Sequence, residues 1–201
     1  MHRSKRLTTL AALLAGLLCC TLGTAQGKVF LSTKEALELA FPGCEVVRTK
    51  HALDAKRKAA ATRLAGHKPR RSMVYGYEAR KDGELVGTAY FDRHRVRSKQ
   101  ELLMIVVDPS SEVRRLEVVA FEEPLDYLPR GSFYAQLIGR RLDRELSTKR
   151  AVVGVTGSTL TVDATVQAVR RVLAAHMVLH PEQVAKRAPK PGEPRRPVGE
   201  Q

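Results

Sequence analysis

The chain has no tryptophan, and aromatic residues make up only 5% of it. Domains that bind single-stranded nucleic acid use aromatic side chains interleaved with basic ones, and no such motif occurs here. We therefore expect no nucleic-acid partner. The formal net charge of +14 favours other anionic partners, such as phosphate ligands or acidic lipid.

Cysteine is also scarce, since only three are present and Cys19 and Cys20 lie in an N-terminal apolar run. Cys44 alone is left for the folded protein, which excludes an internal disulfide, and we expect it to be a small packed side chain. The six histidines show no ligand spacing with cysteine or carboxylate, so the sequence predicts no metal site. Nucleophile–base pairs and paired carboxylates are equally missing, so no catalytic residue is predicted.

The first residues have the composition of a secretory signal peptide. A basic segment at 1–6 precedes an apolar run at 7–22, and small residues at 23–25 offer a cleavage site. The apolar run is short for a membrane span. We therefore predict a signal peptide at 1–26 and an exported protein of the periplasm or cell envelope, with an uncleaved N-terminal anchor as the alternative.

Residues 28–71 read as an N-terminal helical and basic segment. The sequence predicts a short helix at 31–40, a strand at 45–48 and an alanine-rich surface helix at 52–65. The basic residues within 56–71 are typical of a solvated face, and docking on an anionic membrane surface is the alternative.

Beyond residue 72 the hydrophobic pattern changes to the period of strands. Strands are predicted at 73–80, 85–93, 101–108 and 113–121, joined by short turns. Because strands joined by tight turns pair antiparallel, we expect an antiparallel meander of four or more strands. The strand around the apolar run 102–107 is predicted to be the most buried. His94 is interpreted as an ordinary surface or loop histidine.

The most informative stretch is 153–161, where two glycines and several hydroxyl residues precede a helical pattern at 162–179. Unpaired N–H groups at such a helix start favour a phosphate group. A structural alternative is that Thr159 or Thr161 only caps the helix. The helical pattern has one apolar face, and its other face carries Gln167, Arg170, Arg171 and Ala174.

Together these elements predict an α+β fold in which the antiparallel β-meander packs with a few helices. A long C-terminal amphipathic helix follows the loop at 153–158. Residues 140–150 are expected to be polar and exposed. The tail at 181–201 is rich in proline and basic residues, and we predict that it is disordered.

The run Thr156-Gly157-Ser158-Thr159-Leu160-Thr161, ahead of an amphipathic helix, resembles the flavinylation motif of the FMN-binding domain family. That family includes the FMN-carrying subunits of the Rnf and sodium-pumping NADH:quinone oxidoreductase complexes. Its motif runs Asp-x-x-Ser/Thr-Gly-Ala-Thr, and a flavin transferase joins FMN to the last threonine through a phosphoester. Matched position by position, Thr156 is the Ser/Thr and Thr159 the attachment residue, while Val153 replaces Asp and Ser158 replaces Ala.

Two upstream segments resemble the same family in the same order. Glu122 and Pro124 match its Glu-Thr-Pro-Gly-Leu-Gly segment, and residues 133–139 match its short Phe-x-x-Gln-Phe-x-Gly helix. The resemblance covers roughly residues 72–180 and implies that they form an FMN-binding domain. The cofactor-binding residues it implies are Thr159 (the FMN phosphoester), Thr156, Gly157, Ser158, Leu160, Thr161, Glu122 and Pro124.

The resemblance further implies an electron-carrying flavoprotein, an oxidoreductase component rather than a stand-alone enzyme. Its expected partners are a flavin transferase for maturation and redox partner proteins at the membrane. Arginines 93, 95 and 97 offer charge that would neutralise the FMN phosphate, with a solvated strand end as the alternative. Because Val153 replaces Asp, a non-catalytic exported accessory protein of the same fold, which binds FMN non-covalently or not at all, is a second interpretation. A third is a basic envelope protein that docks on anionic lipid.

Overall fold

The computed structural model describes residues 27–186. The predicted signal peptide and residues 187–201 of the predicted tail lie outside the described residues. The strands are β1 (Lys28–Val29), β2 (Glu45–Ala52), β3 (Met73–Lys81), β4 (Glu84–Arg95), β5 (Gln100–Val107) and β6 (Val113–Phe121). The helices are α2 (Thr33–Ala40), α3 (Ala55–Ala65), η1 (Leu125–Tyr127), α4 (Gly131–Ala135), α5 (Thr159–Leu179) and α6 (Pro181–Lys186).

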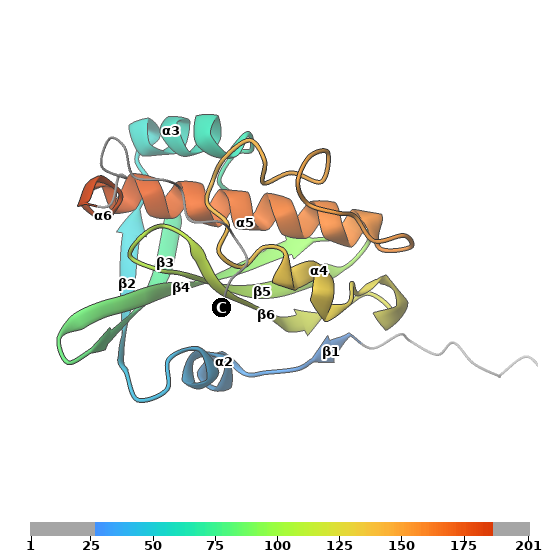
Figure 1. Ribbon diagram of the computed structural model, residues 1–201, viewed down its shortest axis with the longest axis horizontal. Coiled ribbons are helices and arrows are strands. Elements are labelled where there is room, and N and C mark those ends of the chain that lie inside the picture. Colours follow the sequence, from blue (N-terminus) through green and yellow to red (C-terminus); the bar gives the residue numbers. More distant parts are fainter. Residues whose placement is uncertain (1–26, 187–201) are drawn as a thin grey trace, which may run out of the picture.

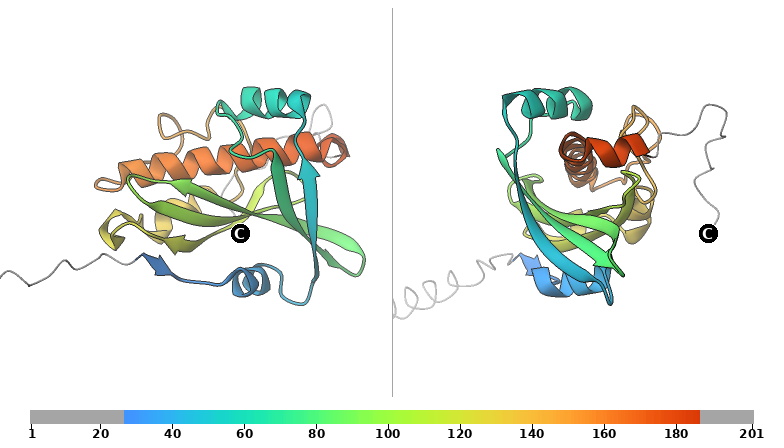
Figure 2. Two further views of the ribbon diagram at one scale, coloured as in Figure 1. Left: turned by 180° about the vertical axis from the view of Figure 1, so that it is seen from behind. Right: turned by 90° about the vertical axis from the view of Figure 1, so that its left-hand side faces the viewer.

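All six strands form one antiparallel sheet in the order β1-β6-β5-β4-β3-β2. Helix α5 runs along one face of this sheet and α2 lies against the other, while α3 lies outside α5 (Figures 1 and 2). The predicted α+β fold with an antiparallel sheet, a few helices and a C-terminal helix is therefore confirmed. Among residues 27–186, no helix is both long enough and apolar enough to cross a membrane.

The N-terminal segment 28–71 supplies both edge strands of the sheet. β1 pairs with β6, with Lys28 opposite Phe121, and β2 pairs with β3 along its whole length. The sequence separated this segment from the domain at 72–180, whereas in the structure the two share one sheet. β2 also runs on to Ala52, beyond the predicted end at residue 48, so that α3 begins only after Asp54, its N-cap.

β5 is the central strand of the hydrophobic core, as its apolar run predicted. Successive side chains of a strand point to opposite faces. Leu103 and Ile105 accordingly pack under α5, and Met104 and Val106 pack in the smaller cluster near α2. All four side chains are fully buried. The sheet is thus apolar on both faces, which explains why β5 reads as one continuous hydrophobic run.

Helix α5 is buried on the face that the sequence pattern left polar. Arg171 is only 9% exposed and Ala174 is fully buried. Ala174 is covered by α3, whose Ala61 and Ala65 pack on it because small side chains let the two helices approach closely. Arg171 instead pairs with Asp92 of β4. Arg170 ties the helices together by donating from its guanidinium to backbone carbonyls near the end of α3 and in the loop 143–146.

Three shorter stretches differ from the sequence-based expectation. Residues 140–150 were predicted to be exposed, but Leu146 is fully buried in the main core. The helix that the family resemblance places at 133–139 is the shorter α4, and the chain turns away at Gly139, where φ is +74°. Residues 181–186 of the predicted tail form α6, which Pro181 opens because a proline suits the first turn of a helix.

Candidate functional site

The loop 153–158 leads directly into α5, which begins at Thr159 rather than at residue 162. Gly157 has φ +86°, a conformation that glycine adopts at little cost. The N-cap is Ser158, and its side chain makes no capping hydrogen bond. Neither Thr159 nor Thr161 is the cap, so that structural alternative is wrong. The start of the 21-residue helix therefore offers N–H groups without a side-chain cap, a setting that favours an anion.

The hydroxyl residues of the motif differ in what they contact. Thr156 and Thr159 are exposed, whereas Thr161 is buried and its Oγ1 donates to the backbone carbonyl of Tyr127 at 2.7 Å. Leu160 is exposed between them. Thr159 is thus the first helical residue and has an accessible side chain.

Gln136 holds the loop from the other side. The N–H of Val153 donates to its Oε1 at 2.9 Å, and its Nε2 donates to the carbonyl of Val153 at 3.3 Å. Gln136 comes directly after α4, and Tyr127 belongs to η1. The three segments singled out in the sequence, at 122–127, 133–139 and 156–161, are therefore brought together around the start of α5.

Glu122 and Pro124 lie at the edge of this region. Glu122 follows β6 and its carboxylate pairs with Arg93 of β4 at 3.1 Å, and it also accepts from the N–H of Gln100 at 3.3 Å. Pro124 is the N-cap of η1. Glu122 thus joins the end of β6 to the end of β4 and the start of β5.

One of the arginines singled out in the sequence contacts Tyr127 of η1. The guanidinium of Arg97 is 5.1 Å from the centroid of the Tyr127 ring. The carbonyl of Tyr127 accepts from Thr161, so a positive charge lies near the first turn of α5. Arg93 is instead engaged by Glu122.

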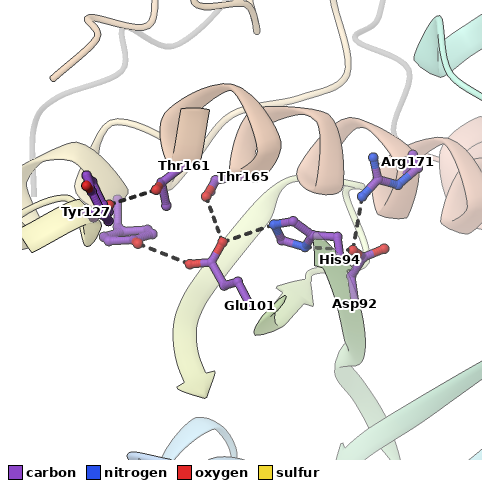
Figure 3. Close-up of polar contacts among 8 residues, drawn as sticks. Asp92, His94, Glu101, Tyr127, Thr161, Thr165 and Arg171 are labelled. Carbon is purple, nitrogen blue, oxygen red and sulfur yellow. Dashed lines mark hydrogen bonds and ion pairs between the residues drawn. The ribbon is translucent and has the colours of Figure 1, made fainter. Parts of the chain in front are cut away.

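Beneath the helix start is a buried polar network that the sequence did not predict. His94 is only 1% exposed, so its interpretation as a surface histidine is wrong. Its Nδ1 lies 3.0 Å from Oδ1 of Asp92, and its Nε2 lies 3.0 Å from Oε2 of Glu101 (Figure 3). β4 continues past residue 93 and turns His94 toward α5, which covers it.

Glu101 links this network to both helices that flank the loop. It is fully buried, and its two oxygens accept from Thr165 of α5 at 3.1 Å and from Tyr134 of α4 at 3.3 Å. Arg171 of α5 closes the other end with an ion pair to Asp92 at 3.1 Å. The network therefore fixes α5 and α4 to β4 and β5.

The charges of the network stabilise one another. Burial disfavours the charged form of His94, but Asp92 and Glu101 outweigh it and raise the pKa of His94 above its ordinary value. Burial also works against the charge of Asp92, but His94 and Arg171 hold its pKa below the ordinary value. When His94 is protonated, it and Arg171 face the carboxyl groups of Asp92 and Glu101.

The surface around Thr159 is exposed rather than enclosed. Two cavities, of about 560 and 510 Å³, lie between α2 and β2 and between α4 and β6, and residues 156–161 line neither of them. Apolar side chains stand exposed instead, with Val153 at 70%, Leu160 at 55% and Leu125 at 49%. Val153 precedes the motif, Leu160 lies in the first turn of α5, and Leu125 lies in η1.

No protein-family model matches the chain, and the comparison with curated proteins finds no similar sequence.

Proposed function

We propose that the protein is an exported FMN-binding flavoprotein that transfers electrons and carries FMN through its phosphate on Thr159. The observation that supports this most is that the three segments resembling the FMN-binding domain family meet at one helix start. Gln136 bonds both backbone groups of Val153, and Tyr127 accepts from Thr161. These contacts join residues that lie 17 and 34 positions apart in the sequence.

The position of Thr159 suits a phosphate group. Thr159 is exposed and therefore accessible to a flavin transferase. The enzyme would transfer the FMN group of FAD to the threonine oxygen: the pyrophosphate bond of FAD breaks, AMP leaves, and the hydroxyl loses its proton. The phosphate would then lie at the positive end of the α5 dipole, where no side chain caps the helix. Arg97, stacked on Tyr127, adds a positive charge nearby.

The exposed setting also suits electron transfer. FMN supplies the redox chemistry, and the protein supplies attachment, orientation and local electrostatics. Val153, Leu160 and Leu125 offer apolar surface on which a flavin ring would pack. A cofactor on an open surface can exchange electrons with a partner protein at the membrane without a lid having to move.

Co-expression with a flavin transferase tests the proposal. We expect yellow protein whose visible absorption stays with the polypeptide after denaturation. Colour that is released on denaturation would support the non-covalent form. Colourless protein with no mass gain would contradict flavin binding and favour an accessory protein of the same fold.

Replacing Val153 with aspartate should raise the fraction of protein that carries covalent flavin. The substitution restores the acidic residue of the family motif, and Gln136 holds only the backbone of this residue. The matched control is Val29→Asp, because Val29 is 71% exposed and lies in β1, an edge strand of the sheet. Loading would be measured as flavin absorbance per polypeptide after denaturation. An unchanged fraction in Val153→Asp, or an equal rise in Val29→Asp, would contradict this role for the residue.

A further inference from the structure

A cluster of histidines lies at the other end of α5. His51 of β2, Glu78 of β3 and His180, the residue that ends α5, each place one potential ligand atom within 4.8 Å of the others. The 21 residues of α5 span about 30 Å, so this cluster is remote from Thr159.

The cluster contains buried nitrogen atoms without partners. Among the described residues, Nε2 of His51 and Nε2 of His180 are both buried and have no hydrogen-bond partner. His180 is only 7% exposed, and its ring centroid is 5.3 Å from that of His51. An unsatisfied buried polar atom costs about 1–3 kcal/mol, so two at one place call for an explanation. A shared ligand would satisfy both.

In His180 and Glu78, a charged neighbour lies near the polar atom that does not face the cluster. Nδ1 of His180 lies 3.7 Å from the Glu182 carboxylate, which leaves Nε2 to face the cluster. Oε2 of Glu78 lies 3.6 Å from the Arg80 guanidinium, which leaves Oε1.

We propose that His51, Glu78 and His180 bind a divalent transition-metal ion of the zinc class. Two imidazole nitrogens and one carboxylate oxygen form a donor set that Zn²⁺ prefers, whereas Mg²⁺ and Ca²⁺ prefer oxygen alone. Water would take the fourth position of a tetrahedral site. Ligands at about 2.0–2.1 Å from zinc lie roughly 3.4 Å apart, so the side chains must close in by about 1–1.5 Å.

A neighbouring histidine also restrains the ring of His180. Nδ1 of His176, one helical turn earlier, shares a hydrogen bond with the Tyr90 hydroxyl at 2.9 Å. The centroid of the His176 ring lies 4.9 Å from that of the His180 ring, which limits how the His180 ring can turn.

Bound metal would connect the edge of the sheet to the end of the long helix. β2 is an edge strand, paired only with β3, and His180 is the C-cap of α5. A metal ion held by β2, β3 and α5 would stabilise this corner of the fold, and it is independent of any flavin at Thr159.

Titration of untagged protein, stripped with chelator, tests the metal site. We expect one Zn²⁺ per chain by calorimetry, a rise in melting temperature with Zn²⁺, and no response to Mg²⁺. His51→Gln, Glu78→Gln and His180→Gln should each weaken binding at least about tenfold. The control is His67→Gln, since His67 is exposed and outside the cluster.

Loss of binding in the three variants, with binding kept in His67→Gln, supports the site. Glu78 is partly exposed, so Glu78→Gln is the variant least liable to disturb folding, and circular dichroism without metal checks this. A wild-type chain that binds no zinc at one equivalent, or a folded Glu78→Gln variant that binds as tightly as wild type, would overturn the proposal.

Discussion

Replacing Thr159 with valine should abolish covalent flavin in protein that is co-expressed with a flavin transferase. Valine keeps the shape of threonine but has no hydroxyl oxygen to form the phosphoester. Thr159 is exposed at the start of α5, so the substitution leaves the core intact. The measurement is flavin fluorescence of the denatured polypeptide, for which we expect no signal above background.

Ser158→Ala is the matched control for the loss of a hydroxyl. It restores the alanine of the family motif at the neighbouring position, and the Ser158 side chain makes no capping hydrogen bond. The variant should keep its covalent flavin. Flavin that persists on Thr159→Val, or that disappears equally from Ser158→Ala, would rule out Thr159 as the specific attachment residue.

Replacing Glu101 with alanine should lower the free energy of unfolding by roughly 3–5 kcal/mol, because it breaks a buried ion pair and leaves a charge uncompensated. Glu101 is fully buried, and it contacts His94, Thr165 and Tyr134. Without it, the positive His94 keeps only Asp92, and two hydroxyl groups lose their acceptor. Urea unfolding followed by circular dichroism measures the loss.

The control for this variant is Glu117→Ala on the surface of β6. Glu117 pairs with Arg115 at 2.8 Å, but both side chains are about a third exposed, so the expected loss is below about 1 kcal/mol. Comparable losses in the two variants would contradict a buried network that fixes α5 and α4 to the sheet.

Because the pKa of His94 is raised in the folded protein, the stability that the network contributes should fall as the pH rises. A histidine whose folded pKa is raised contributes stability that is fully present below its unfolded pKa, near 6.5. That contribution is lost as the pH rises through the folded pKa. The alkaline loss of stability should therefore be shallower in Glu101→Ala than in wild type, because one of the two carboxylates that raise the pKa is gone.

The sheet could be predicted because its signals are local. Alternation and tight turns at 73–121 are properties of neighbouring residues, and the apolar run of β5 reflects a sheet covered on both faces. The burial of α5 could not be read in this way. In the sequence, Arg171 and Ala174 look like an exposed face. In the structure, Arg171 pairs with Asp92 of β4 and Ala174 packs against α3, more than 100 residues earlier.

The run that resembles a flavinylation motif, Thr156 to Thr161, could be found in the sequence because its residues are contiguous. The contacts of Gln136 with Val153 and of Thr161 with Tyr127 depend on tertiary structure, as does the burial of His94. The histidine cluster was missed for the same reason, since its three ligands come from three separate elements. The spacing of these three residues along the chain does not reveal the site. The site forms only when β2 pairs with β3 and the end of α5 lies beside them.

Mass mapping of the protein after co-expression with a flavin transferase tests the central claim most directly. Cleavage after Arg150 and Arg170 releases one peptide that contains Thr156, Ser158, Thr159 and Thr161. We predict that this peptide gains the mass of one FMN group and that fragmentation assigns it to Thr159. An unmodified peptide from a protein that is otherwise fully folded, or a modification on another residue, would contradict the claim.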